Sequence, residues 1–333
     1  MSDLPPITFC RSLAGLAAGG QHYVVTAFKE RGYEVTTIGD GPLKVTRDEV
    51  VFVMNNFAWY PRIRRQLVAM PRERRPLTMT WHTEPLPLPS AAKFDRPGLQ
   101  LRELAKIILR DSRASDVYTN SYYLRQLARS GIPDVLIVST PSRREYLAEQ
   151  GISSHWVPFG YDSTYGSDLK LTRDVDVLFL GTPDDARHRQ AVRYLKRKGV
   201  NVLAKGSWTD PACWGNERTK LINRTKIFLG LQRRPGKLSG VRMLLGMANK
   251  ALVIAEPMYD SSPYVEGKHF ISASLEEMPE VIDHYLQHDS ERERITDEAY
   301  RFVTEEVTLA KSLASIGSLL EQQWAARLEL SSS

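Results

Sequence analysis

Cysteine is scarce in this chain of 333 residues, which contains only Cys10 and Cys213. Two cysteines exclude a disulfide scaffold and any zinc site built mainly from thiolates. The longest apolar runs, such as residues 175–180 and 251–255, are far shorter than the roughly 20 residues that cross a bilayer. The first residues also lack the charged region and small-residue cleavage site of a signal peptide. We therefore expect a globular, cytoplasmic protein whose cysteines are small apolar core residues.

The usual sequence motifs of nucleotide chemistry are missing too. Gly15 is followed by Leu16, so the first glycine-containing loop is not the GxGxxG fingerprint, which argues against a dehydrogenase. The chain has neither a GxxxxGK[ST] motif nor an evident carboxylate-rich segment for Mg²⁺. We therefore expect no metal site and no bound cofactor.

Positive charge is concentrated in two parts of the chain. Residues 1–160 hold 21 basic and 15 acidic side chains, and residues 161–250 hold 18 and 8. Residues 251–333 are acidic, with 6 basic and 16 acidic side chains. Two basic regions predict two anionic partners, or two parts of one partner.

Short apolar runs alternate with helical patterns along the chain. The runs are rich in Val, Ile, Thr or aromatic residues, as strands buried on both faces are. Their alternation with helices predicts βαβ units and parallel, doubly wound sheets. The expected strands are residues 7–10, 34–38, 50–54, 77–81, 117–120, 135–139, 175–180, 201–204, 227–231, 251–255 and 269–273. The expected helices are residues 22–31, 61–70, 99–110, 122–130, 142–150, 186–198, 216–223, 239–248, 275–288, 291–304 and 309–330.

A linker divides this pattern into two halves. Residues 158–172 contain Gly, Pro and other turn formers but no periodic apolar residues. We predict a Rossmann-like domain at 1–160, a second at 173–305 and a C-terminal helix within 306–333. Two such domains that face each other form a cleft at the carboxyl ends of their strands, where open α/β sheets bind ligands.

Two features of the first half are candidates for contacts in that cleft. Gly19 and Gly20, with His22, open the first helix, where backbone amides suit an anion; a plain tight turn is the alternative. His82 and Glu84 follow the fourth expected strand, where either can act as a general base on a substrate hydroxyl. The alternative for His82 is a histidine that only hydrogen-bonds the backbone.

The second half has basic residues at a helix start. Gly181 and Thr182 end a strand, and Arg187 and Arg189 lie in the first turns of the next helix. Arginine opposes the helix dipole there, so its presence favours a nearby phosphate; a solvated helix face is the alternative.

A second basic helix start follows at residues 233–242 (RRPGKLSGVR), with Ser239 as a plausible helix cap before Gly240 and Arg242. Together with Lys205 and the Arg187 region, this loop explains the positive charge of residues 161–250. A diphosphate is the natural ligand of such a loop. The protein itself must then supply the positive charge, which predicts a metal-independent site.

Residues 59–76 (WYPRIRRQLVAMPRERRP) contain six arginines. As a basic amphipathic stretch, Arg62–Arg75 is suited to an anionic membrane surface or an acidic acceptor, although most such runs are solvated faces. Nucleic-acid binding is a weaker hypothesis, because the aromatic residues are not spaced as a stacking platform. We do not expect a nucleic-acid partner.

The second half resembles the C-terminal domain of GT-B glycosyltransferases, specifically group-1 sugar transferases of the spore-maturation-protein type. The similar segments, in family order, are VDVLFLGTPDDARHRQAVRYLKRKGVNV, RTKLINRTKIFLGLQ, VRMLLGMANKALVIAE and SPYVEGKHFISASLEEMPEVIDHYL. In the first half, AAGGQHYVVTAFKERGYEVTTIG is similar to the Gly-Gly loop and first helix of such enzymes, and EYLAEQGISSHWVPFGYD to their exit into the linker.

This resemblance implies a glycosyltransferase that binds a nucleotide-sugar, such as a UDP-sugar, in its second domain and an acceptor in its first. Arg242 and the amides of Ser239 and Gly240 would contact the donor diphosphate, helped by Arg187 or Arg189. The family favours retention of the anomeric configuration, in which the leaving phosphate takes the proton.

The resemblance also implies roles outside the diphosphate site. Glu256 and the loop through Glu266 would lie near the sugar or ribose. His82 matches a histidine at the cleft edge of the first domain. The last helix would pack back on the first domain.

Two residues depart from the family pattern. Leu245 replaces a glutamate that holds the ribose hydroxyls, and Lys250 replaces the glycine that ends this helix. Leucine accepts no hydrogen bond, so the ribose contact must be rearranged or lost. The leading hypothesis is a sugar transferase, cytoplasmic or peripheral at the inner membrane face, whose acceptor is a small molecule, glycan, lipid or protein. The alternative is a non-catalytic GT-B-like binding protein.

Overall fold

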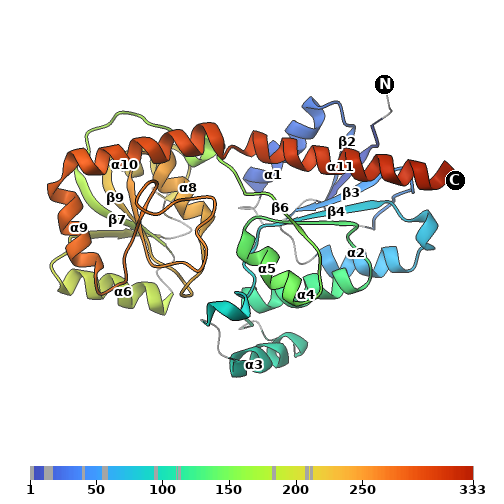
Figure 1. The fold of residues 1–333 in the computed structure, drawn as a ribbon, viewed down its shortest axis with the longest axis horizontal. Helices are drawn as coiled ribbons and strands as arrows, with labels where there is room; N and C mark the ends of the chain where they lie inside the picture. The colour runs from blue at the N-terminus through green and yellow to red at the C-terminus, as the bar shows by residue number, and fades with distance from the viewer. Residues whose placement is uncertain are drawn as a thin grey trace. The chain divides into compact units, whose positions relative to one another are not determined.

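Two parallel sheets organise the chain in the computed structural model (Figure 1). The structure describes residues 4–10, 18–39, 42–54, 59–93, 97–109, 111, 114–181, 185–206, 210 and 213–332. Unit 1 comprises residues 1–158 and 312–333, and unit 2 comprises residues 159–311.

The sheet of unit 1 has the strand order β2-β1-β3-β4-β5-β6, and all its pairings are parallel. The order changes direction between β1 and β3, as in doubly wound folds. The strands are β1 (Ile7–Cys10), β2 (Val35–Ile38), β3 (Val50–Met54), β4 (Leu77–His82), β5 (Val135–Val138) and β6 (His155–Trp156).

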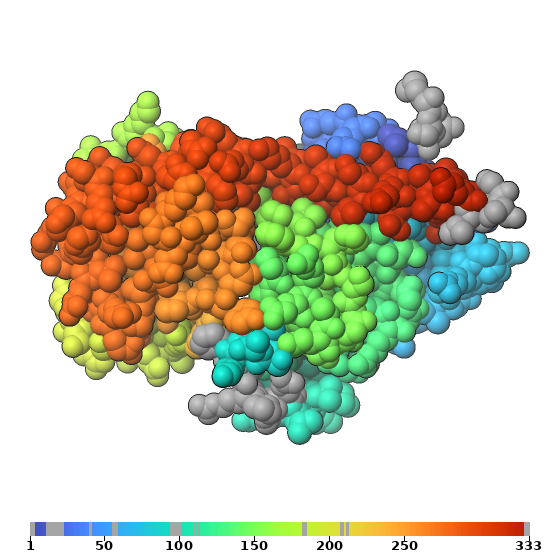
Figure 2. All heavy atoms as spheres, viewed as in Figure 1, coloured from blue at the N-terminus to red at the C-terminus, as the bar shows by residue number. Residues whose placement is uncertain are grey.

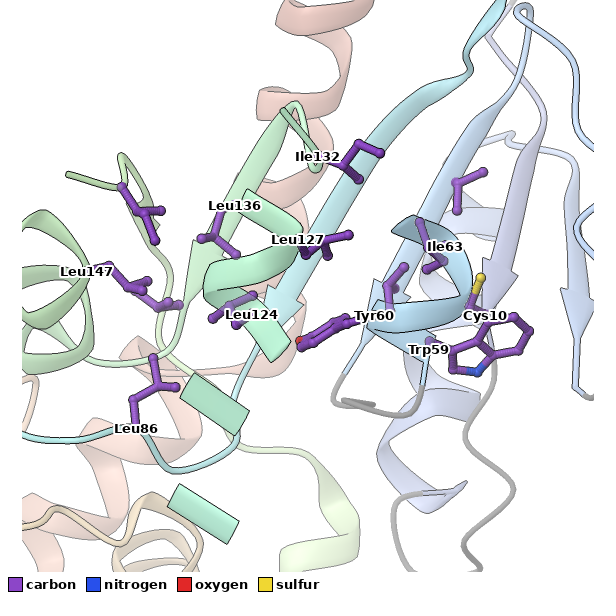
Figure 3. Packing of buried hydrophobic residues seen from close by; sticks show 14 of the residues in the cluster. Cys10, Trp59, Tyr60, Ile63, Leu86, Leu124, Leu127, Ile132, Leu136 and Leu147 are labelled. Carbon is purple, nitrogen blue, oxygen red and sulfur yellow. The ribbon is translucent and has the colours of Figure 1, made fainter. Parts of the chain in front are cut away.

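Helices cover both faces of this sheet (Figure 1). One face packs against α2, α4 and α5 through a buried cluster that includes Val51, Ile63, Leu124 and Leu147 (Figure 3). On the other face, Phe28 of α1 packs edge-on against Phe52, 5.3 Å between ring centroids. The helices are α1 (Ala18–Glu30), α2 (Trp59–Val68), α3 (Pro97–Ile108), α4 (Asp116–Arg129) and α5 (Pro141–Glu149).

The C-terminal helix α11 (Leu309–Ser332) joins unit 1 through its residues from Ser312 onward. Glu321 accepts hydrogen bonds from Arg31, at 2.9 Å, and from the Tyr33 hydroxyl, at 3.3 Å. Ile316 and Leu320 are fully buried. This helix therefore adds apolar and ionic contacts to unit 1 without adding a strand.

The sheet of unit 2 has the order β11-β10-β9-β7-β8 and is again parallel throughout. Here the order changes direction between β7 and β9. The strands are β7 (Val175–Leu180), β8 (Val202–Lys205), β9 (Thr225–Gly230), β10 (Leu252–Ala255) and β11 (Ile271–Ser272).

Apolar clusters on the two faces of this sheet bind different helices. One joins Phe179 and Ile254 to α6 and α9, and the other joins Phe228 and Val253 to α7 and α8. The helices are α6 (Ala186–Arg197), α7 (Gly215–Asn223), α8 (Gly240–Ala248), α9 (Met278–Gln287) and α10 (Asp289–Arg301), which continues as a π-helical turn, Phe302–Glu306. The predicted fold of two parallel, doubly wound sheets is confirmed.

One expected strand is wrong. Residues 117–120 lie in the first turns of α4, not in a strand. Val117, Asn120, Leu124 and Leu127 are all buried, a helical spacing that extends through the element. The β-branched and aromatic run Val117–Thr119 favours a strand locally, but this longer amphipathic pattern decides the structure. The short strand β6 was not predicted.

Buried amides fix the segment that follows residue 158. Asn249, fully buried, donates to the carbonyls of Tyr165, at 2.9 Å, and Leu245, at 2.8 Å. Asn223 donates to Asn249 Oδ1 at 2.8 Å and accepts from the Leu169 backbone N–H at 2.7 Å. Gly166 has φ +117°, and a Cβ there would lie 2.3 Å from Asn249 Oδ1. The predicted linker residues 159–172 are thus tied to unit 2.

Asn249→Ala should destabilise unit 2 by about 2 kcal/mol, because it removes the buried hydrogen bonds to the Tyr165 and Leu245 carbonyls. The segment it holds should also open, so trypsin should cleave faster after the exposed Lys170. Urea unfolding and timed proteolysis measure the two effects. Asn201→Ala, at an exposed position, is the matched control, and equal behaviour of the two variants would refute the role of the amide network.

Candidate functional site

Arg242 lies at the point where the strand order of unit 2 changes direction. Its Nε donates to the Leu180 carbonyl at the end of β7, at 3.3 Å, and its Nη1 donates to the Leu231 carbonyl just after β9. The guanidinium also lies over the Phe179 ring, 5.2 Å from the centroid. Open α/β sheets bind ligands at this position, outside the carboxyl ends of the strands.

The charge of Arg242 has no direct counter-ion among the described residues. Within the described part of the chain, no carboxylate forms an ion pair with it. Burial, together with the nearby charge of Arg233, lowers the pKa of Arg242 to about 10. The group stays protonated at neutral pH, but its charge is poorly solvated, and a bound anion would relieve that cost.

The N-terminus of α8 is open to a ligand. Ser239 occupies the N-cap position without a side-chain capping bond, and Gly240 has open space where a side chain would project. The first amides of α8 therefore keep the partial positive charge of a helix start. The start of α6 differs, because the Asp185 carboxylate already accepts from the His188 backbone N–H at 3.0 Å.

Two glycines let the loops after β7 and β8 meet closely. A Cβ at Gly206 would lie 1.6 Å from the Gly181 carbonyl oxygen, and a Cβ at Gly181 would strike the Phe179 ring at 2.2 Å. Gly181 N–H also donates to the Lys205 carbonyl at 2.9 Å. Only glycine at both positions allows this approach beside Arg242.

Arg187 binds Glu256 in a bidentate ion pair, with 2.8 Å between Nη1 and Oε2. Glu256 also accepts from the Gln232 backbone N–H at 2.7 Å. The Gln232 side chain donates to the Glu256 carbonyl at 2.9 Å, while its buried Oε1 has no partner. Arg187, predicted to bind phosphate, and Glu256, predicted to contact the sugar, therefore neutralise each other. Gln232, which the sequence analysis did not single out, holds Glu256 in place.

His188 is a second buried polar group beside Arg242. It is 1% exposed, its ring packs edge-on against Phe179, and neither ring nitrogen has a hydrogen-bond partner. Burial and then the charge of Arg242 lower the pKa of His188, so the ring is neutral. The Asp185 carboxylate, 3.9 Å from Nδ1, is thus a neighbour rather than an ion-pair partner.

The remaining predicted donor residues lie around this centre in different ways. Arg189 is exposed on α6. The Lys205 ammonium lies 3.7 Å from the Asp210 carboxylate. Glu266 is exposed in a loop where its backbone pairs with Phe270. Thr182 lies outside the described residues.

Leu245 and Lys250 have structural roles in and just after α8. Leu245 is buried in the apolar cluster with Phe228 and contributes no hydrogen-bond acceptor. Lys250 has φ +54°, the left-handed conformation in which glycine commonly ends a helix. Its ammonium binds Asp297 at 2.6 Å and Asp168 at 3.5 Å, contacts that a glycine lacks.

His82 is completely buried at the end of β4 in unit 1. Its Nδ1 lies 2.8 Å from the Tyr60 hydroxyl at the start of α2, and its Nε2 has no partner. Burial, with a smaller effect of the Arg143 charge, lowers the pKa of His82 to about 3. Such a histidine is neutral and only weakly basic at pH 7.

Glu84 is the stronger candidate for a base. It is partly exposed, and burial raises its pKa despite the opposing charge of Arg143. Arg143 lies in the first turn of α5, where its backbone N–H donates to the Thr140 cap and its guanidinium to Ser139. A basic residue at a helix start, the signal that singled out Arg187, also marks Arg143 in the sequence.

The other predicted site of unit 1 is described only in part. Gly19, Gly20 and His22 lie in the first turns of α1, but their side-chain surroundings and the preceding residues 11–17 are outside the described part of the chain.

The arginines of the 62–75 stretch have mixed environments. Arg62 lies over the Trp59 ring, Arg64 donates to Gln126 at 3.3 Å, and Arg75 donates to the Met70 and Val68 carbonyls. A pocket of about 320 Å³ beside α2 is lined by Tyr60, Pro61, Arg64, Arg65, Val68, Tyr123 and Gln126.

The described residues provide neither a metal site nor a membrane span. They contain no group of three or more His, Cys, Asp or Glu side chains placed to hold a metal ion. None of their helices is long and apolar enough to span a membrane.

Comparison with protein families gives one match. Residues 187–317 match the profile of the family described as Glycosyl transferase-like. Residues 187–317 thus resemble a glycosyltransferase domain. The match begins at Arg187 in the first turn of α6 and includes Arg242 and Glu256. No curated protein matches the sequence.

Solved structures share the fold at low sequence identity. Anabaena HepE in complex with UDP and glucose has a TM-score of 0.62 at 10% identity, over 96% of this chain and 100% of that chain. S. aureus TarM has 0.58 at 12% identity, over 89% and 57%. The pneumococcal O-GlcNAc transferase GtfA, solved with UDP and GlcNAc, has 0.55 at 11%, over 92% and 60%. This chain thus spans under two thirds of TarM and GtfA, and the likeness establishes a GT-B fold.

The buried His82 should make unit 1 less stable in acid. Its folded pKa, about 3, lies below the usual value of 6.5, so its contribution is complete above pH 6.5 and is lost as pH falls from there toward 3. Between pH 7 and pH 5 the wild type should lose roughly 2 kcal/mol more than His82→Gln, which does not titrate. Hydrogen exchange of the β4 and β5 amides measures this difference. Parallel pH profiles for the two proteins would contradict the assignment.

Proposed function

We propose that this protein transfers a sugar from a nucleoside-diphosphate sugar to an acceptor hydroxyl, without a metal ion. The observation that carries the proposal is Arg242, a half-buried cation with no carboxylate partner among the described residues, held where the strand order of unit 2 changes direction. The open start of α8 lies three residues before it in the sequence. Arginine and helix amides together suit a diphosphate and stabilise it as a leaving group.

The relatives in fold support the same class of donor. HepE and GtfA were solved with UDP, and HepE also with UDP-glucose. A UDP-sugar is therefore the first donor to test. We infer retention of configuration and kinship with the spore-maturation-protein type from the sequence resemblance.

Glu84 is the proposed acceptor-side group, and the Arg143 charge acts on its carboxylate. Its raised pKa and partial exposure suit contact with an acceptor hydroxyl. Under retention the leaving phosphate can take the proton, so Glu84 would chiefly orient the acceptor. The acceptor and a peripheral membrane position through residues 62–75 stay predictions from the sequence.

A binding protein without turnover is the second candidate. It is favoured by Leu245, which offers the ribose no acceptor, and by the mutual neutralisation of Arg187 and Glu256. Release of UDP from a UDP-sugar, abolished in a His82→Ala/Glu84→Ala variant, would support the transferase. Tight nucleotide binding without turnover over a panel of acceptors would support the binding protein.

Two substitutions test the diphosphate site. Arg242→Gln should weaken UDP binding about 50-fold, since it removes charge-assisted hydrogen bonds. Gly240→Leu should weaken it similarly by filling the space before α8, where an added Cβ has no neighbouring atom within 4 Å beyond the adjacent residues and its own helix. Isothermal titration with UDP, GDP and dTDP measures both effects. Thermal unfolding of the Gly240→Leu variant checks that it is folded.

Arg197→Gln, an exposed arginine in the last turn of α6, is the control and should bind as the wild type does. If Gly240→Leu binds UDP normally, the ligand is not at this helix start. If the wild type binds no nucleoside diphosphate, the proposed function is wrong.

A further inference from the structure

Helix α3 of unit 1 exposes a row of large aliphatic side chains. Leu101, Leu104 and Ile108 are 72%, 38% and 65% exposed, and Leu109 just beyond the helix is 79% exposed. The first three are spaced i, i+3 and i+7, which puts them on one face of the helix. In Figure 2 the described part of α3 is visible at the surface of unit 1 in teal.

The opposite face of α3 is its attachment to the unit. Ile107 and Glu103 are buried there, and α3 packs against α4. Glu103 accepts from Lys106 Nζ at 2.6 Å and from the Ser115 backbone N–H at 2.7 Å. The helix is thus fixed by a buried carboxylate, and its aliphatic row is not part of the core.

The sequence around this row is basic. Glu103, the single acidic residue in the α3 sequence, is buried, whereas Arg102 is exposed. Residues 93–113 together contain six Lys or Arg and three Asp or Glu. Exposed aliphatic residues flanked by basic ones are the pattern of helices that lie in the interface of an anionic membrane.

The exposed area of this aliphatic row helps to decide what kind of partner covers it. Its four side chains expose on the order of 400 Å². Each partner of a stable protein dimer contributes about 800 Å². A second copy of the chain would need much more surface than this row provides, whereas an interfacial helix needs only its apolar stripe.

We propose that α3 docks the protein on the surface of an anionic lipid bilayer. Its aliphatic row lies among the acyl chains at the headgroup boundary, and the exposed Arg102 faces the lipid phosphates. This contact differs from the 62–75 stretch expected from the sequence, where the exposed large aliphatic side chain is Val68. It is independent of the proposed sugar transfer.

Flotation of the full chain with vesicles tests the proposal. The vesicles are phosphatidylcholine with and without phosphatidylglycerol. Leu101→Gln/Leu104→Gln/Ile108→Gln keeps good helix formers and should reduce binding to the anionic vesicles at least roughly tenfold. Leu169→Gln/Leu171→Gln, at exposed leucines of unit 2, is the matched control and should bind as the wild type does. Thermal unfolding and UDP titration check that each variant is folded.

Wild-type binding that requires phosphatidylglycerol, weakens with salt and is lost in the α3 variant supports the proposal. Failure of the wild type to float, or flotation of the α3 variant at the wild-type level, overturns it. Loss of binding in Arg72→Gln/Arg74→Gln alone assigns the membrane contact to the 62–75 stretch instead. A wild-type dimer that the α3 substitutions convert to monomer, seen by sedimentation, shows that a second copy covers the row.

Discussion

The hydrogen bonds of the half-buried Arg242 guanidinium are the interaction on which the architecture of unit 2 and its proposed chemistry both depend. The guanidinium bonds the carbonyl at the end of β7 and the carbonyl just after β9, the two neighbouring strands between which the chain order changes direction. Among the described residues the Arg242 side chain contacts these carbonyls and the Phe179 ring, which compensate a positive charge incompletely. The same contacts that fix the helix α8 against the sheet therefore leave a positive charge where a parallel sheet receives its ligand.

The groups around Arg242 keep this charge in place. The Arg187–Glu256 pair, supported by Gln232, ties the first turn of α6 to the end of β10 without using the charge of Arg242. His188 stays neutral because burial and neighbouring cations oppose its protonation. The Asn249 amides hold the far end of α8 to the segment after residue 158. With its far end fixed, α8 presents an ordered start toward the ligand position, which is the preorganisation that electrostatic stabilisation of a leaving group requires.

Much of this fold follows from local pattern, and much of the site does not. The sequence predicts three strands with the bounds that the structure has, at residues 7–10, 50–54 and 175–180. Each is a short, mainly apolar run of the kind that parallel sheets bury. Residues 117–120 were wrongly predicted as a strand, because their local strand preference conflicts with the helical pattern of buried residues along the whole of α4. Arg242 was predictable as a basic residue at a helix start. The pairing of Arg187 with Glu256, 69 residues later, was not, because local spacing carries no information on which charges meet. The burial of His82 was not predictable for the same reason. It depends on Tyr60, which lies 22 residues earlier in the sequence, and the packing of α2 against β4 brings the two side chains together.

The central claim is that a nucleoside diphosphate binds at the start of α8 beside Arg242. A crystal structure of the protein soaked with UDP tests it most directly. The account predicts diphosphate oxygens within hydrogen-bond distance of the Arg242 guanidinium and of the first backbone amides of α8. A well-ordered UDP whose phosphates lie elsewhere, with Arg242 still bonded only to the Leu180 and Leu231 carbonyls, would contradict it.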